Sequence, residues 1–391
     1  MTRPRLALRS RYFFMILSVL CLAPFVMGAL VAVESESEDS LFKQLSVLSE
    51  VLTLIQRTYV DETSISALLE GALEGATDAL DPMATFVPAD HKETYAETLR
   101  VGSSRSGVVV AKDRGVAYAV AVAEGSPAAT AGIQRGDVIS AIDGVSARNM
   151  ALWRLQSLLA GTAGTELELE LLRGGQSRTA ELLLGPFEGP RPSIRRHDEI
   201  AVLRLPRFAS EDVGIVRDLI ADTVGDDDRL IVDLRGTAGG EAEAAFEIAA
   251  LFASGKLGSM RSRDAELRTY DSDLPPLWQG SVAVVMDGGT QGPAEILAAI
   301  LKQSTEATLV GQPTFGLAGR RGLIDLPNGS LVVMTDALYA GPDGEPIDER
   351  LRPDELVRAT LRSLADEDVS LDDLMLERAV EVLARAGEKA A

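Results

Sequence analysis

The chain has 391 residues, 46% of them hydrophobic and 25% charged, which is typical of a globular protein with two or three domains. Its formal net charge of −21 argues against a nucleic-acid or anionic-lipid surface, because both need clustered lysine and arginine. One cysteine, Cys21, and two histidines, His91 and His197, allow no disulfide within the chain and no Cys/His zinc cluster, so we expect neither metal nor cofactor.

Residues 1–33 are predicted to be an export signal. Four arginines precede an uncharged run from Tyr12 to Val33, and acidic residues follow it. The run is long enough to span a bilayer as a helix, with the basic end inside. A cleaved signal peptide is the alternative, but candidate sites near Ala29 and Ala32 lack a small residue three positions before the cut. We therefore favour an inner-membrane anchor, with the body facing the periplasm or the cell exterior.

Residues 41–100 are predicted to form a small helical module. From Leu41 to Tyr59, apolar residues recur at three- and four-residue spacings, as in an amphipathic helix. A second helical stretch, roughly Ile65 to Leu80, ends where Asp81-Pro82 follows. The remaining segment, to about Leu99, also has a helical pattern.

Residues 101–186 have a different sequence pattern, typical of short strands and turns. Short valine-rich strands, Gly107–Ala111 and Ala117–Ala123, alternate with turns that contain Gly, Pro and Asp. The motifs that follow are Gly-Ser-Pro-Ala at 125–128, Ala-Gly at 131–132, Gly-Asp-Val-Ile at 136–139 and Asp-Gly at 143–144. At these intervals they resemble a PDZ domain.

A PDZ domain binds a peptide tail by strand addition, and backbone amides of a loop receive the terminal carboxylate. The resemblance places this loop at Arg105, Ser106 and Gly107, with Val108 and Val109 opening the strand. Arg105 stands where relatives usually carry glycine, and a cation beside a carboxylate is not unfavourable. The alternative is a PDZ fold that serves only as a spacer.

Residues 193–360 are predicted to form an α/β core, after a linker around 185–192. Apolar strands alternate with helices, and the strand that ends in Asp233-Leu234-Arg235 leads through Gly239-Gly240 into a helix. The expected strands are 200–205, 229–234, 282–286 and 330–334, and the expected helices are 211–224, 241–252 and 293–301. Residues 361–391 would add a C-terminal helical segment. The fold class predicted for the whole chain is thus multidomain α+β.

Taken together, these features resemble the carboxyl-terminal processing (tail-specific) peptidases, exported serine peptidases whose PDZ domain recognises the substrate's tail. The resemblance extends from Leu41 to Val357. Outside the PDZ domain, its motifs are Tyr59-Val60-Asp61, Leu80-Asp81-Pro82, Asp233-Leu234-Arg235 with Gly239-Gly240, Thr314-Phe315-Gly316, and Pro342-Asp343-Gly344 followed by Ile347 and Arg352-Pro353-Asp354.

The family's chemistry needs a serine nucleophile and a lysine base. The serine belongs to a Ser-Ala-Ser-Ala-Ser-Glu-Ile type of stretch, and the lysine follows Thr-Phe-Gly. Aligned on Glu295-Ile296 and on Thr314-Phe315-Gly316, the two positions are Gly292 and Leu317, and Arg321 occupies a further polar position. Glycine has no attacking atom and leucine cannot accept a proton. The resemblance therefore implies a degenerate member with no catalytic residue.

Three functions stay open at this point. The first is a pseudopeptidase that binds the tails of exported or membrane proteins, as a scaffold or as a regulator of an active relative, or that associates with itself. The second is an active serine-type endopeptidase with a displaced nucleophile such as Thr290, for which Lys302 is a poor base. The third is a structural envelope protein. Gly239 and Gly240 could present oxyanion donors, or could simply form a tight turn.

Overall fold

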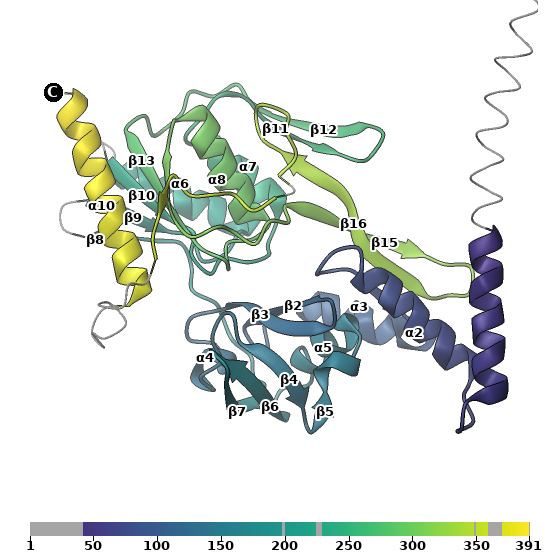
Figure 1. Ribbon diagram of the computed structural model, residues 1–391. Coiled ribbons are helices and arrows are strands. Elements are labelled where there is room, and N and C mark those ends of the chain that lie inside the picture. Colours follow the sequence, from purple (N-terminus) through teal and green to yellow (C-terminus); the bar gives the residue numbers. More distant parts are fainter. Residues whose placement is uncertain (1–41, 198–199, 224–228, 348, 359–369, 391) are drawn as a thin grey trace, which may run out of the picture. The chain divides into compact units, whose positions relative to one another are not determined.

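The computed structural model describes residues 42–197, 200–223, 229–347, 349–358 and 370–390 (Figure 1). The predicted anchor at residues 12–33 lies outside this part of the chain. Of the helices within these ranges, none is both long and apolar enough to cross a membrane. The chain divides into two compact units, Met1–Ala72 and Leu73–Ala391.

The first unit holds a helix over residues 42–58 and the start of α2 (Ile65–Asp78), close to the predicted ranges. The prediction of a helix from there to Leu99 was partly wrong. The strand β1 (Thr85–Val87) comes first, with all three side chains buried, and α3 (Lys92–Val101) follows a short 3₁₀ turn. Asp81-Pro82 breaks the helix, and the apolar Thr-Phe-Val run then pairs with a distant strand.

The PDZ region is a sheet in the order β2-β3-β4-β6-β7, with β5 on β4. Its elements are β2 (Val108–Asp113), β3 (Val116–Val122), α4 (Pro127–Thr130), β4 (Val138–Ile142), β5 (Val145–Ser146), α5 (Leu152–Leu159), β6 (Glu166–Arg173) and β7 (Gln176–Leu183). Alternate residues of β6 are buried and join Leu155 and Leu159 of α5 in the core. Strand β2 forms one edge of the sheet.

The core domain is a six-stranded sheet in the order β17-β14-β13-β10-β9-β8. Its strands are β8 (Ser193–His197), β9 (Ile200–Arg204), β10 (Arg229–Asp233), β13 (Ser281–Met286), β14 (Thr308–Gly311) and β17 (Glu355–Leu356). Only β8 runs antiparallel to its neighbour. The expected strand at 229–234 and those at 200–205 and 282–286 therefore lie side by side.

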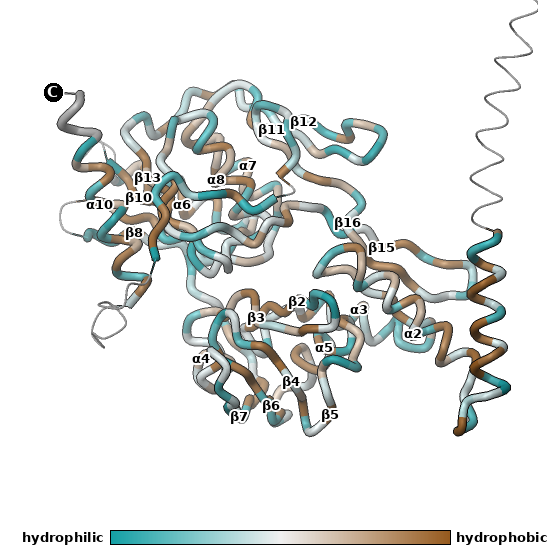
Figure 2. The backbone as a smooth tube through the Cα atoms, viewed as in Figure 1, coloured by the Kyte–Doolittle hydropathy of each residue, from teal (hydrophilic) through white to brown (hydrophobic). Residues whose placement is uncertain are grey.

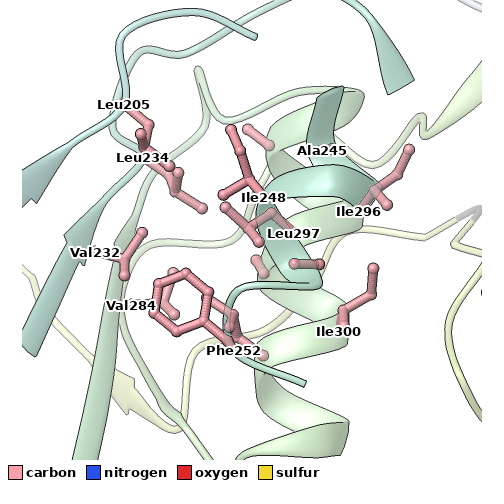
Figure 3. Packing of buried hydrophobic residues seen from close by; sticks show 14 of the residues in the cluster. Leu205, Val232, Leu234, Ala245, Ile248, Phe252, Val284, Ile296, Leu297 and Ile300 are labelled. Carbon is pink, nitrogen blue, oxygen red and sulfur yellow. The ribbon is translucent and has the colours of Figure 1, made fainter. Parts of the chain in front are cut away.

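Helices cover both faces of this sheet (Figure 1). On one face lie α6 (Val213–Thr223), α7 (Ala242–Ala249) and α8 (Pro293–Ser304), packed against Leu230, Val232 and Val284 (Figure 3). On the other face the alternate residues Ile231 and Val285 contact α10 (Leu371–Ala390), which carries both hydrophobic and hydrophilic stretches (Figure 2). Burial on both faces explains the continuous apolar runs of these strands.

A second sheet has the order β1-β16-β11-β12, with β15 on β16. It comprises β11 (Gly255–Arg261), β12 (Glu266–Ser272), β15 (Gly319–Asp325) and β16 (Leu331–Ala340) besides β1. The sequence predicted only the start of β16, at 330–334. The other strands escaped notice because most side chains of β12 and β15 are exposed and supply no apolar run.

Candidate functional site

The candidate site is organised by one buried carboxylate, that of Glu295 in the first turn of α8. Its Oε2 accepts hydrogen bonds from the amides of Gly292, at 3.0 Å, and Leu317, at 3.1 Å. Its Oε1 accepts from the Thr314 hydroxyl at 2.5 Å and the Gly316 amide at 2.6 Å. The two positions inferred from sequence are thus brought together, although the motifs that contain them are distant in the chain.

The electrostatics of this carboxylate follow from its surroundings. Burial raises the pKa of Glu295 above its ordinary value of 4.5, while the hydrogen bonds from Thr314 and from the three amides act in the opposite direction. A buried carboxyl group is tolerated because four donors satisfy its two oxygens. Glu295 therefore serves as a structural tie between the start of α8 and the loop after β14.

Gly292 is the residue just before α8, with φ of 62° and ψ of −115°. A Cβ placed there would meet no atom within 4 Å, so the position has room for a side chain even though its φ favours glycine. Leu317 is half-buried and packs into a cluster with Phe315, Val109 and Tyr118. Neither position presents an atom that can attack a carbonyl group or accept a proton.

Thr290 and Lys302, the residues considered as substitutes, have other partners. The buried Thr290 hydroxyl donates to the Leu234 carbonyl at 2.9 Å and accepts from the Asp287 amide at 3.0 Å. Lys302 lies on α8 and forms an ion pair with Asp354 at 2.7 Å. The threonine oxygen is therefore occupied by structural hydrogen bonds.

Gly239 and Gly240 lie between β10 and α7, with φ of 75° and 112°. A Cβ at Gly240 would be 2.5 Å from the carbonyl oxygen of Phe208, so this residue must be glycine. Within the described residues, no oxygen accepts a hydrogen bond from the amide of either glycine. The turn therefore serves the fold and also leaves two backbone donors unused, so both interpretations of the motif are compatible with it.

Asp287, at the end of β13, is a site residue that the sequence analysis missed. Its Oδ1 accepts from the amides of Gly236, at 2.9 Å, and Gly289, at 2.8 Å. Its Oδ2 forms an ion pair with Arg135 of the PDZ region, and the Asp287 side chain is only 5% exposed. The sequence contains one indication of Asp287, because an acidic residue directly follows a buried apolar strand there. It contains no indication that Arg135, on another domain, would be its partner.

The predicted tail-binding loop precedes β2, where Ser106 and Gly107 are buried and Arg105 is half-buried. The Gly107 amide donates to the Ser103 carbonyl at 2.6 Å, whereas the amides of Arg105 and Ser106 have no acceptor within the described residues. Val108 points into the PDZ core, and Val109 points to the opposite face. The role of these five residues in binding remains a prediction.

A large cavity, of about 1310 Å³, is lined by residues of the PDZ region and of the core, but not by Gly292 or Leu317. The PDZ region contributes Gly107 and Val109 to its wall, and the core contributes Arg204, Gly236 and Asp287. A space of this size can hold several residues of a peptide. Its walls mix charged and apolar groups.

Two family models match this chain. Residues 199–357 match the model of peptidase family S41, and residues 118–173 match the PDZ domain. The carboxy-terminal-processing protease of Bartonella bacilliformis is 25% identical over 326 residues, which cover 81% of this chain and 75% of that protein. The carboxy-terminal processing protease CtpA of Bacillus subtilis is 27% identical over 319 residues, 80% of this chain and 68% of that protein.

A solved structure gives the same architecture. The photosystem II D1 C-terminal processing protease superposes with a TM-score of 0.63 at 23% identity, covering 81% of this chain and 95% of that chain. At this identity the likeness concerns the fold alone.

Proposed function

We propose that this protein binds the carboxyl-terminal tails of other proteins without cutting them. The proposal starts from the matches to a PDZ domain and to peptidase family S41 and from the similarity to carboxyl-terminal processing proteases. One observation carries the proposal. Glu295 holds Gly292 and Leu317 together in the frame where nucleophile and base would meet, and neither residue has a reactive group.

The magnitude of the loss supports inactivity. In a hydrolase that depends on a nucleophile and a base, removing either one lowers turnover by roughly 10⁶-fold, and removing both costs about the same. Backbone donors such as those of Gly239 and Gly240 can leave on the order of 10³–10⁴-fold acceleration over water. That remainder is too small for a working peptidase.

The binding half of the proposal rests on the PDZ region. Strand β2 is the edge of its sheet, the amides of Arg105 and of the buried Ser106 have no acceptor within the described residues, and Gly107 of the loop lines a cavity. We assign the tails to exported or membrane proteins, with the chain held in the inner membrane by residues 12–33 and its body facing the periplasm or the cell exterior. The protein would act there as a scaffold, or as a regulator of an active relative.

The alternative, an endopeptidase with a displaced nucleophile, is less well supported. Thr290 would have to give up its hydrogen bonds to Leu234 and Asp287 before attacking a substrate. The candidate base considered for it, Lys302, is paired with Asp354.

The test combines binding and cleavage. The purified chain is titrated with eight-residue peptides that end in Ala-Val, with either a free or an amidated carboxyl terminus, and is incubated with unfolded casein. We expect binding that requires the free carboxylate, and no casein cleavage above a mock preparation. Cleavage that disappears in Thr290→Ala would overturn the pseudopeptidase assignment. Equal binding of both peptide forms would overturn tail recognition.

A further inference from the structure

The far end of the PDZ peptide groove is closed by the chain itself. The open edge of β2 presents the main-chain groups of Val108, Val110 and Lys112, because alternate residues of an edge strand point away from the sheet. The amide of Lys112 already has a hydrogen-bond acceptor within the chain. The Lys112 amide donates to the Pro82 carbonyl at 2.9 Å.

Side chains hold this closure on both walls of the groove. On the β2 side, the buried Lys112 ammonium donates to the Met150 carbonyl at 2.8 Å and pairs with Asp78 at 3.0 Å. On the helix side, the Thr85 hydroxyl oxygen accepts from the Trp153 amide of α5 at 3.2 Å. The segment 78–85 therefore spans from β2 to α5.

The turn that carries Pro82 is fixed in turn by Asp81. One carboxylate oxygen accepts from the Met83 amide at 2.8 Å, and the other accepts from the Thr335 amide of β16 at 3.2 Å. Pro82 is thus held from its own loop and from the second sheet of the core.

The consequence for a bound tail follows from strand geometry. A tail that adds antiparallel to β2, with its terminal residue opposite Val108, places its third-last residue opposite Val110 and its fifth-last opposite Lys112. The Pro82 carbonyl occupies the place of the acceptor that the fifth-last residue would supply.

We propose that the segment Asp78–Thr85 blocks the far end of the peptide groove and thereby restricts recognition to the last four residues of a tail; we call this segment the stop. This inference rests on the tail-binding function proposed above. Val110 remains available to pair with these residues, and the Val108 amide has only a long contact of 3.5 Å, to the Ser106 hydroxyl. Residues before the fourth-last must leave the groove, so they add little affinity. The preferred ligand is a tail whose last four residues alone pair with β2.

A peptide ladder tests the stop. Acetylated peptides of three, four, six and eight residues, all ending in Ala-Val with a free carboxylate, are titrated into the full chain. We expect affinity to rise up to four residues and then to stay level. The Asp81→Ala substitution releases the turn. In this variant the affinity for the six- and eight-residue peptides should rise about tenfold, because one or two backbone hydrogen bonds to β2 can then form. The affinity for the three-residue peptide should not change. Asp90→Ala, an exposed aspartate of the neighbouring turn, is the matched control.

Hydrogen exchange gives a readout that needs no ligand. The Lys112 amide should be protected in the free protein and should exchange at least about tenfold faster in Asp81→Ala, while the Ala111 amide, which faces β3, stays protected. An unprotected Lys112 amide, or affinity that keeps rising to eight residues in the unaltered chain, would overturn the stop. Failure of every peptide to bind, with Lys112 protected, would instead refute tail binding and leave the closure supported.

Discussion

Gly292 and Leu317 share a hydrogen-bond acceptor: both backbone amides donate to Oε2 of Glu295. At positions 292 and 317 these hydrogen bonds involve only main-chain amides, so they do not depend on which side chains stand there. The same main-chain hydrogen bonds can therefore form whatever side chains stand at positions 292 and 317.

Restoring the two side chains should restore cleavage. In Gly292→Ser with Leu317→Lys, the serine Cβ has open space, and the apolar neighbours Phe315 and Tyr118 would lower the pKa of the new lysine. We expect casein cleavage that rises with pH as the lysine loses its proton. The φ of 62° at position 292 will lower the stability of the variant, because a non-glycine residue there is strained by about 1–3 kcal/mol.

Each single substitution is the control for this gain of function. Gly292→Ser lacks a base and Leu317→Lys lacks a nucleophile, so both should remain at background. Activity in either single variant, or in the unaltered chain, would contradict the assignment of these two positions.

Glu295→Gln should destabilise the core, with a defined pH dependence. The amide nitrogen would face the Gly292 and Leu317 donors, and two unsatisfied donors cost about 2–4 kcal/mol. Because burial raises the pKa of Glu295, the unaltered chain has its full stability below pH 4.5 and loses part of it as the pH rises through the folded-state pKa. The stability difference between the two proteins should therefore narrow with rising pH.

Urea unfolding curves at several pH values measure this difference. Glu377→Gln, at an exposed position of α10, is the matched control and should behave like the unaltered chain throughout. A difference that widens with rising pH would show that the four hydrogen bonds outweigh burial.

The ion pair between Arg135 and Asp287 should couple the stabilities of the PDZ region and the core. Arg135→Ala leaves a buried carboxylate without its counter-charge, and we expect a loss of about 3 kcal/mol. Asp287→Asn retains an acceptor for Gly236 and Gly289, so adding it to Arg135→Ala should recover part of the loss.

A double-mutant cycle measured by chemical denaturation checks this coupling. Arg154→Ala, an exposed arginine of α5, should change the free energy of unfolding by less than about 0.5 kcal/mol. Strict additivity of the two substitutions would contradict a direct pair.

Gly107→Ala should disrupt the tail-binding loop. Its φ is +77°, and the new Cβ would be 2.0 Å from the Cβ of Ser126, so the loop or α4 must move. We expect a loss of about 2–4 kcal/mol and of peptide binding. Gly102→Ala has a φ of +54° but meets no atom within 4 Å, so it should cost only about 1–2 kcal/mol and retain binding. Peptide titration and thermal unfolding of both variants separate backbone strain from the clash.

Several elements were predictable from local patterns. The apolar strand before Asp233 and the helix that starts at Pro293 have short-range signals, and Glu295 served as an alignment anchor. Strand β1 and the β15 strand were not predictable, because their pairing with β16 depends on contacts distant in the sequence. The same holds for Arg135, whose partner Asp287 lies on another domain. Local periodicity reports which face of an element is apolar, but it does not identify the partner of a polar group.

The way in which Glu295 is bonded has a practical consequence. Because the carboxylate is satisfied by the backbone of positions 292 and 317, side chains at these positions can be exchanged without removing its hydrogen bonds. A cysteine with a histidine, or two metal-binding side chains, could be installed there as readily as the serine and lysine. The chain thus offers protein engineers two neighbouring positions for reactive side chains in a protein that also has a PDZ domain.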